Sequence, residues 1–333
     1  MKPQSKTRTG RQNRIVLLTV LAVMIITFVV TLGICYHALQ NESYARYVGI
    51  MDVAAEKIAK SVRGMEMNAK NVFDEVEKHL DSPEAVIAAL ESKASLNPDV
   101  SGYFAAFEPE YFPEKGTWFE PYVHHNDSSD YEMTQVGSAR HNYHRTEWYV
   151  RAKESGESFW ADPYYYYDGT DISGHYTTFV KPILDENGQL VCVCGADMTF
   201  EWLTKELQRI NEEFKNDDML KHKQSDFYIV VMNNDGSCIA YPDERSVSMT
   251  EDDVIHNMSQ KKSGIVNMTI YGVPSTVYYG PIDHINWTAA LVVPQHSLLK
   301  QLLTPALIML AIAVIGLLIV WLVCRRRKDA EAV

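Results

Sequence analysis

Residues 189–214 read QLVCVCGADMTFEWLTKELQRINEEF and change their periodicity midway. The first half is a short apolar run in which Cys192 and Cys194 stand two residues apart, so that on a strand they share one face. From residue 199 onward, apolar residues recur at helical spacing with charges between them, which predicts an amphipathic helix over 199–214. Strand patterns lie on both sides of this helix, and we therefore predict two consecutive α/β modules of unequal size.

Short strand-like segments fill the chain before and after this helix. They are rich in aromatic and β-branched residues and are separated by turn signals such as Glu186-Asn187-Gly188 and Asn234-Asp235-Gly236. Each module is therefore expected to be built around an antiparallel sheet. The segments are GYFAAFEP (102–109), TWFEPYVHH (117–125), ESFWADPYYY (157–166), HYTTFVKPIL (175–184), DFYIVVMN (226–233), SCIAYP (237–242), GIVNMTIYG (264–272), STVYYGPI (275–282) and NWTAALVVP (286–294).

Two uncharged apolar runs enclose the strand region. Residues 15–36 and 302–324 are each long enough to cross a hydrocarbon core of about 30 Å as a helix. Basic residues precede the first run and follow the second, so the positive-inside rule places 1–14 and 325–333 in the cytoplasm. We predict a protein of the inner (plasma) membrane whose residues 37–301 lie outside the cytoplasm, in the periplasm. The tail RRRKDAEAV is too short for an output module, which is expected on a separate cytoplasmic signalling partner or lost from a shortened gene.

The segment between the two runs is acidic. It holds 22 Lys and Arg against 41 Asp and Glu, a net charge of −19. Such a segment is not expected to bind nucleic acid or an anionic bilayer, and it would attract small cations.

Residues 37–80 are expected to form a stalk helix that continues the first membrane helix. Apolar residues recur there at spacings of three and four, and no Pro or Gly cluster interrupts the pattern. One apolar face between Ala54 and Leu80 exceeds what a single module would cover, which predicts a homodimer along it. Ser82 and Pro83 then give the signature of an N-cap and first position of a second, short helix.

Ordered motifs over nearly the whole external segment resemble the double Cache sensor domains of bacterial membrane receptors. The resemblance implies an α+β fold with two PAS-like antiparallel-sheet modules on the stalk helix: a membrane-distal module over 82–200 and a membrane-proximal module over 220–296. The motifs are Trp148-Tyr149, Trp160-Ala-Asp-Pro-Tyr164, Thr178-x3-Pro182-Ile183 and Gly195-Ala-Asp197-Met198, followed by Asn234-Asp-Gly236, Tyr241-Pro242, Tyr279-Gly-Pro-Ile282, Trp287 and Val293-Pro294.

The resemblance also implies a ligand pocket, with residues 147–171 as its lid. Tyr and Trp suit a lid because each offers a large apolar face and one polar group. In the family the Asp matching Asp197 holds a ligand ammonium; the alternative for this residue is a helix N-cap, shared with Thr199. Trp160 and Pro163 are expected to fill core between lid and sheet. The candidate ligand-binding residues are Arg145, Trp148, Tyr149, Tyr164, Tyr166, Asp168 and Asp197.

Arg145 departs from the family pattern. Amino-acid-sensing members carry Arg-x-Trp-Tyr, in which Arg holds the ligand carboxylate, whereas here Arg145 stands three residues before Trp148. One residue on a helix or tight turn rotates a side chain by about 100°. An amino acid and an amine therefore both remain candidate ligands.

The sequence offers little for metal or catalytic chemistry. His124, His125, Asp127, His141 and His144 lack a metal-binding motif and are interpreted as a solvated, His-rich rim. No nucleophile motif or phosphate loop is present, so neither an enzyme nor a cofactor is expected. The leading hypothesis is a membrane-anchored sensor of a small polar metabolite. The alternative is a non-signalling scaffold or accessory subunit, and a polar-tipped pocket under Tyr164 and Asp197 would favour the sensor.

Overall fold

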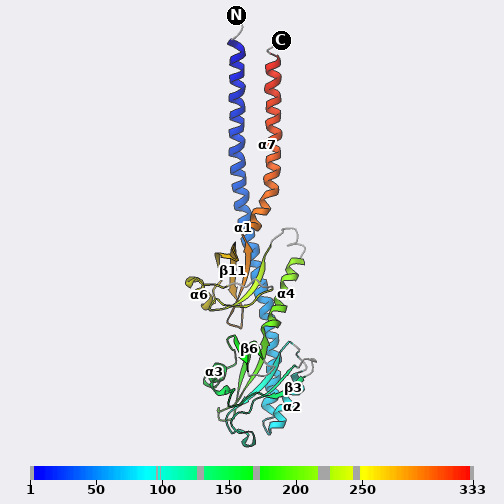
Figure 1. Cartoon of the computed structure of the whole chain (residues 1–333), viewed down its shortest axis with the longest axis vertical. Coiled ribbons are helices and arrows are strands. Elements are labelled where there is room, and N and C mark those ends of the chain that lie inside the picture. Colours follow the sequence, from blue (N-terminus) through cyan, green and yellow to red (C-terminus); the bar gives the residue numbers. More distant parts are fainter. Residues whose placement is uncertain are drawn as a thin grey trace.

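The computed structural model describes residues 4–94, 97, 99–125, 131–167, 173–216, 226–242 and 248–330. Two long helices, α1 (Gln4–Lys78) and α7 (His296–Ala330), run side by side, so that both termini lie at the same end of the molecule (Figure 1). Both are long and apolar enough to cross a membrane. The two sheet modules follow one another along the rest of α1, and the predicted α+β architecture on a continuous stalk is confirmed.

The distal module is a seven-stranded antiparallel sheet with strand order β3-β2-β1-β7-β6-β4, in which β5 also pairs with β6. Helix α2 packs at β1–β3, and helix α3 lies over β6 and β7. The elements are α2 (Pro83–Ala94), β1 (Gly102–Phe107), β2 (Pro121–His125), β3 (Tyr131–Gln135), α3 (Glu147–Ser155), β4 (Phe159–Trp160), β5 (Tyr164–Tyr167), β6 (Ser173–Leu184) and β7 (Leu190–Thr199), with 3-10 turns η1 (Pro113–Lys115) and η2 (Tyr143–Arg145).

The start of α2 follows its predicted capping signal. The Ser82 hydroxyl accepts a hydrogen bond from the backbone N–H of Ala85 (3.2 Å), and Pro83 is the first helical residue. A side-chain oxygen at the N-cap satisfies one of the backbone donors that a helix start leaves open. The chain can therefore turn sharply from the end of α1 into α2.

The proximal module is a five-stranded antiparallel sheet with order β10-β11-β12-β8-β9. It is joined to the distal module by α4, whose backbone at Trp202 donates to the Thr199 hydroxyl (3.2 Å). Thr199 is thus the residue that caps this helix. The elements are α4 (Phe200–Asn216), β8 (Tyr228–Asn233), β9 (Cys238–Ala240), α6 (Asp252–Ser259), β10 (Gly264–Ile270), β11 (Val273–Pro281) and β12 (Trp287–Pro294).

The two faces of the distal sheet serve different purposes. Cys192 and Cys194 on β7 are fully buried in the core that includes the stalk residues, so the prediction that they share a face is confirmed. Val193, between them, belongs to the cluster under α3 on the opposite face, together with Phe104 of β1. Strand alternation thus sends one set of side chains to the stalk and the other to the lid.

The apolar face of the stalk is covered by the chain's own modules. Residues predicted to form a dimer surface are buried within the monomer: Ala54, Ile58, Val62, Met65, Val72, Phe73 and Val76. Two modules stack along α1 and together cover this stripe, so the stripe gives no independent support for a dimer. Of the predicted face, Val53 remains half exposed.

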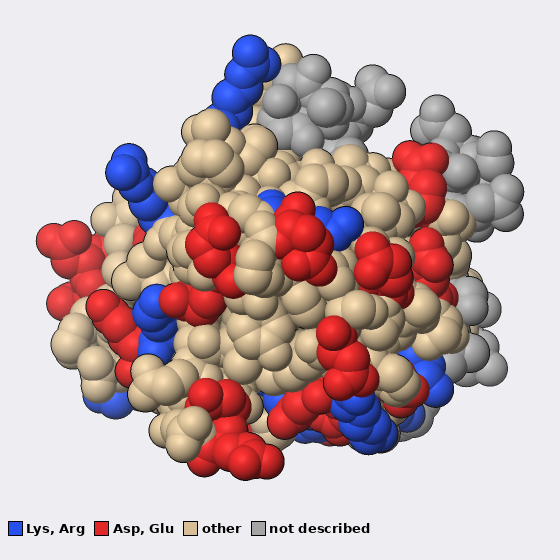
Figure 2. All heavy atoms as spheres, turned by 90° about the horizontal axis from the view of Figure 1, so that it is seen from below, with Lys and Arg blue, Asp and Glu red and all other residues tan. Residues whose placement is uncertain are grey.

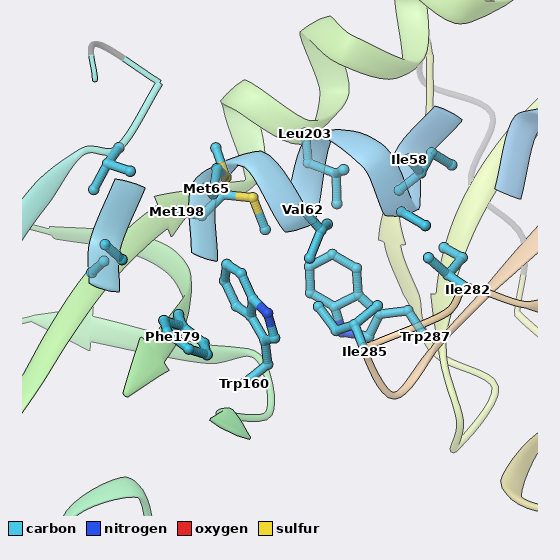
Figure 3. Close-up of a cluster of buried hydrophobic side chains, with 14 of the residues drawn as sticks. Ile58, Val62, Met65, Trp160, Phe179, Met198, Leu203, Ile282, Ile285 and Trp287 are labelled. Carbon is cyan, nitrogen blue, oxygen red and sulfur yellow. The ribbon is translucent and has the colours of Figure 1, made fainter. Parts of the chain in front are cut away.

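A shared core joins the stalk and both modules (Figure 3). Trp160 enters it from the distal module and lies 5.5 Å from Phe179 and 6.4 Å from Trp287 of the proximal module, between ring centroids. Its indole N–H donates to the Glu66 carboxylate on α1 at 2.7 Å. The expectation that Trp160 fills core holds, but this core lies on the stalk side of the sheet, and it connects three parts of the molecule.

Candidate functional site

A cavity of about 440 Å³ lies between the distal sheet and its lid. The sheet contributes Phe104, Tyr122 and Asp197, and the lid contributes α3 and the Tyr164–Tyr167 strand. Nine of the nineteen residues in its wall are aromatic. A concave, largely aromatic space of this size with a few polar groups is typical of small-molecule sites.

The lid helix is held rigidly at its base. The Tyr149 hydroxyl donates to the Glu108 carboxylate (2.6 Å), which also accepts two hydrogen bonds from Lys153 at 2.7 Å. At its end, Gly156 adopts the left-handed conformation (φ 65°) and donates to the carbonyl of Ala152. Such a glycine stop ends the helix cleanly and lets the chain return toward the sheet.

Asp197 lies at the sheet side of the cavity and is only 7% exposed. One carboxylate oxygen accepts a hydrogen bond from the Thr178 hydroxyl at 2.6 Å, and the Tyr164 hydroxyl lies 3.5 Å from the same oxygen. The Tyr164 and Thr178 hydroxyls are also bonded to each other (2.7 Å). Since Thr199 caps α4, the side chain of Asp197 lines the cavity and is not the N-cap of the helix.

Burial controls the charge of this carboxylate. It raises the pKa of Asp197 from 3.8 to about 6, against the opposing effect of the hydrogen bonds from Thr178, Tyr122 and Tyr164. Desolvation disfavours the charged form, and a positive group placed beside it would restore ionisation. Near neutral pH, Asp197 is therefore a buried negative charge whose hydrogen bonds within the described residues come from hydroxyl groups and not from a cation.

The remaining charged residues of the cavity wall are mostly acidic. They are Glu120, Glu147, Asp162, Arg151 and the titratable His141. Arg151 lies over the ring of Phe159, with its guanidinium carbon 3.8 Å from the ring centroid. Viewed from the membrane-distal end, acidic side chains form several patches among mostly uncharged residues, with basic side chains beside some of them (Figure 2). The excess of acidic residues in the cavity wall favours a ligand that carries positive charge.

The structure brings four of the seven predicted site residues to the cavity: Trp148, Tyr164, Tyr166 and Asp197. Arg145 is exposed at the end of η2 and is absent from the wall. Tyr149 is 1% exposed and is turned toward Glu108, so it supports the lid from behind. Asp168 lies outside the described residues.

Four charged residues of the wall were not among the predicted site residues: Glu120, Glu147, Arg151 and Asp162. Arg151 stands three residues after Trp148 on α3, and this helical spacing places both on one face of the helix. That spacing was the available signal. Glu120 precedes β2 as a single acid in an aromatic segment, and nothing local in the sequence marks it.

The His-rich segment differs from the predicted solvated rim. His124 is buried, and its two ring nitrogens lie 3.0 Å from the His125 carbonyl and 3.1 Å from the Thr134 hydroxyl. Within the part of the chain that the structure describes, no three His, Cys, Asp or Glu residues are placed to hold a metal ion. Asp127 lies outside the described residues.

Gly195 makes room for one wall of the cavity. A Cβ atom added there would lie 2.0 Å from the ring of Phe104, which packs directly over the β7 backbone. We expect Gly195→Ala to destabilise the protein by about 1–3 kcal/mol, as overpacking does, and to push the Phe104 ring toward the cavity. Chemical denaturation of the full chain checks this. Gly64→Ala, on the exposed face of α1 where an added Cβ meets nothing within 4 Å, controls for a glycine replacement away from the cavity and should not destabilise the protein. An unchanged denaturation midpoint for Gly195→Ala would contradict the packing described.

Comparison with known proteins agrees with this architecture. Residues 86–205 match the sequence profile of the family described as methyl-accepting chemotaxis protein-like, first PDC sensor domain. This stretch contains the cavity and its lid. No curated protein matches the chain.

Solved structures share the fold of both modules. The extracellular domain of mmHK1S-Z3, a protein assigned as a histidine kinase, superposes with a TM-score of 0.64 at 16% identity, covering 78% of this chain and 96% of that one. The periplasmic sensory domain of the Campylobacter jejuni chemoreceptor Tlp1 gives 0.59 at 15%, covering 79% and 98%. The ligand-binding domain of the Pseudomonas fluorescens chemoreceptor CtaA, in complex with L-isoleucine, gives 0.55 at 18%, covering 80% and 98%. The resemblance to double Cache sensor domains is confirmed at the level of the fold.

Proposed function

We propose that this chain, whose residues 86–205 belong to the first PDC sensor domain family of methyl-accepting chemotaxis protein-like receptors, is a membrane-anchored sensor of a small ammonium-bearing metabolite. The ligand, an amine or an amino acid, binds in the distal cavity between the sheet and the lid. Helices α1 and α7 anchor the chain in the inner membrane, with the two modules on the periplasmic side.

The buried Asp197 is the observation that supports this proposal most strongly. A carboxylate with raised pKa in an aromatic cavity is stabilised by a bound ammonium, which neutralises it and gains charge-assisted hydrogen bonds. Rings from both lid and sheet surround the same space and attract a cation through their faces. In a scaffold without a ligand, this unpaired buried charge would lower stability and serve no binding role.

Signal transfer would begin at the lid. Trp160 lies in the short connection between α3 and β5, both of which line the cavity, and its indole contacts α1 and the proximal module. Closure of the lid on a ligand therefore acts on the stalk helix through a rigid aromatic contact. A cytoplasmic partner would read the output. We also propose that the chain self-associates, as expected from the sequence.

A thermal-shift panel on the full chain in nanodiscs tests the ligand class. We expect amines or amino acids to raise the unfolding midpoint, corresponding to about 2–4 kcal/mol at saturation, because a ligand that binds only the folded state stabilises it by mass action. Dicarboxylic acids, which carry no ammonium, serve as the matched negative set. Stabilisation by the acids alone would contradict the ammonium site, and stabilisation by no compound would favour the scaffold alternative.

A further inference from the structure

The cavity wall holds a second buried carboxylate, Glu120. It is 3% exposed, and its Oε2 atom has no hydrogen-bond partner within the described residues. The Nε2 atom of His141 lies 3.5 Å away and is charged only when protonated. Buried polar atoms almost always have partners, so an orphaned carboxylate oxygen in a ligand cavity calls for a functional explanation.

Glu120 and Asp197 reach the cavity from separate positions on the sheet. Asp197 pairs with Gly102, which pairs with His124, four residues beyond Glu120 along the same segment. A strand rises about 3.4 Å per residue, so the two backbone positions are offset by about 14 Å along the strands. Tyr122 lies between Glu120 and His124 in this segment, and its ring also lines the cavity.

The charge of Asp197 acts on Glu120. Burial is the main cause that raises the pKa of Glu120 well above its usual value, and the charge of Asp197 adds to it. A ligand with one ammonium relieves the penalty at Asp197 and leaves the one at Glu120. A ligand with two positive groups, spaced by an apolar chain that contacts the rings, relieves both.

We propose that Glu120 forms a second cation subsite, so that the preferred ligand carries two ammonium groups separated by a short apolar chain. This inference rests on the proposed function, because Asp197 receives the first ammonium. Two kinds of molecule share this chemistry, an α,ω-diamine and a basic amino acid. Only the basic amino acid also carries a carboxylate. Arg151, which lies in the cavity wall, is the cation that would bind this carboxylate.

Calorimetric titration of the full chain in nanodiscs compares dications with their monocationic counterparts at about pH 8. Putrescine is paired with butylamine, cadaverine with pentylamine, and lysine with norleucine. In the wild-type protein we expect at least one dication to bind ten- to a hundredfold tighter than its counterpart, as for one charge-assisted hydrogen bond. Equal affinities in all three pairs would overturn the inference without any variant.

Variants then assign the preference to a residue. Glu120→Gln should remove the advantage of the dication and leave the monocation unchanged, whereas Glu154→Gln, at an exposed acid of α3 outside the cavity wall, should change neither substantially. A dication advantage that survives Glu120→Gln would overturn the assignment. Arg151→Ala distinguishes a basic amino acid from a diamine. The affinity for lysine should fall, and the affinity for cadaverine should stay the same or rise.

The outcomes also separate this inference from the proposed function. If norleucine or a monoamine binds through Asp197 and no dication is preferred, the second subsite is wrong and the sensor proposal stands. If none of the six compounds binds the wild-type protein, the dication inference fails. The wider thermal-shift panel then decides whether the ammonium site fails with it.

Discussion

Asp197→Asn is expected to make the ligand-free protein more stable near neutral pH. The folded-state pKa of about 6 lies above the ordinary aspartate pKa of 3.8, so the stabilising contribution of the protonated carboxyl is present below pH 3.8 and is lost as pH rises through 6. A difference of two pKa units corresponds to about 3 kcal/mol. Asparagine keeps an acceptor for the Thr178 hydroxyl without the charge. The free energy of unfolding of the two proteins, measured from pH 4 to 8, should therefore diverge as pH rises.

The same variant should lose the ligand. Removing the charge eliminates a charge-assisted hydrogen bond to the ammonium, which costs about 1.5–3 kcal/mol, or a ten- to hundredfold loss of affinity. Asp99→Asn removes the same charge from an exposed position of the distal module outside the cavity wall and is the matched control, with little expected change. If Asp197→Asn instead unfolded the protein while binding by the remaining folded fraction were normal, Asp197 would be a structural residue and the site would lie elsewhere.

Trp160→Ala is expected to destabilise the protein by about 3–5 kcal/mol, the usual effect of truncating a large buried aromatic residue. The substitution empties the centre of the shared core and leaves Glu66 without its indole donor. Chemical denaturation of the full chain measures the loss. Trp160→Phe should recover most of the stability, since it restores a ring while still lacking the N–H group.

Tyr167→Ala provides the reference for an aromatic residue of the same stretch. Its side chain is 68% exposed, and the expected change lies within about 0.5 kcal/mol. A Trp160→Ala protein as stable as Tyr167→Ala would show that the three parts of the molecule do not share the core seen in Figure 3.

Local patterns predicted much of the fold. The two-residue spacing of Cys192 and Cys194 correctly gave a shared strand face, and Ser82 caps the helix that its position indicated. These features depend on neighbours in the sequence, which is why the sequence alone could identify them. The long stalk was predicted for the same reason, since its apolar spacing is regular along its length.

Features that depend on tertiary contacts were harder to predict. The stalk stripe looked like a dimer surface because the sequence does not reveal that both modules pack on it. Tyr149 looked like a ligand contact because its partner Glu108 lies 41 residues earlier in the chain. Glu120 could not be found at all, because only sheet pairing brings it to the same cavity as Asp197.

The crystal structure of the protein with the most strongly stabilising compound from the panel tests the central claim directly. The account predicts that the ligand lies in the distal cavity under Tyr164, with its ammonium nitrogen about 2.7–2.9 Å from a carboxylate oxygen of Asp197. A ligand bound in the proximal module, or in the distal cavity with no cationic group near Asp197, would contradict it.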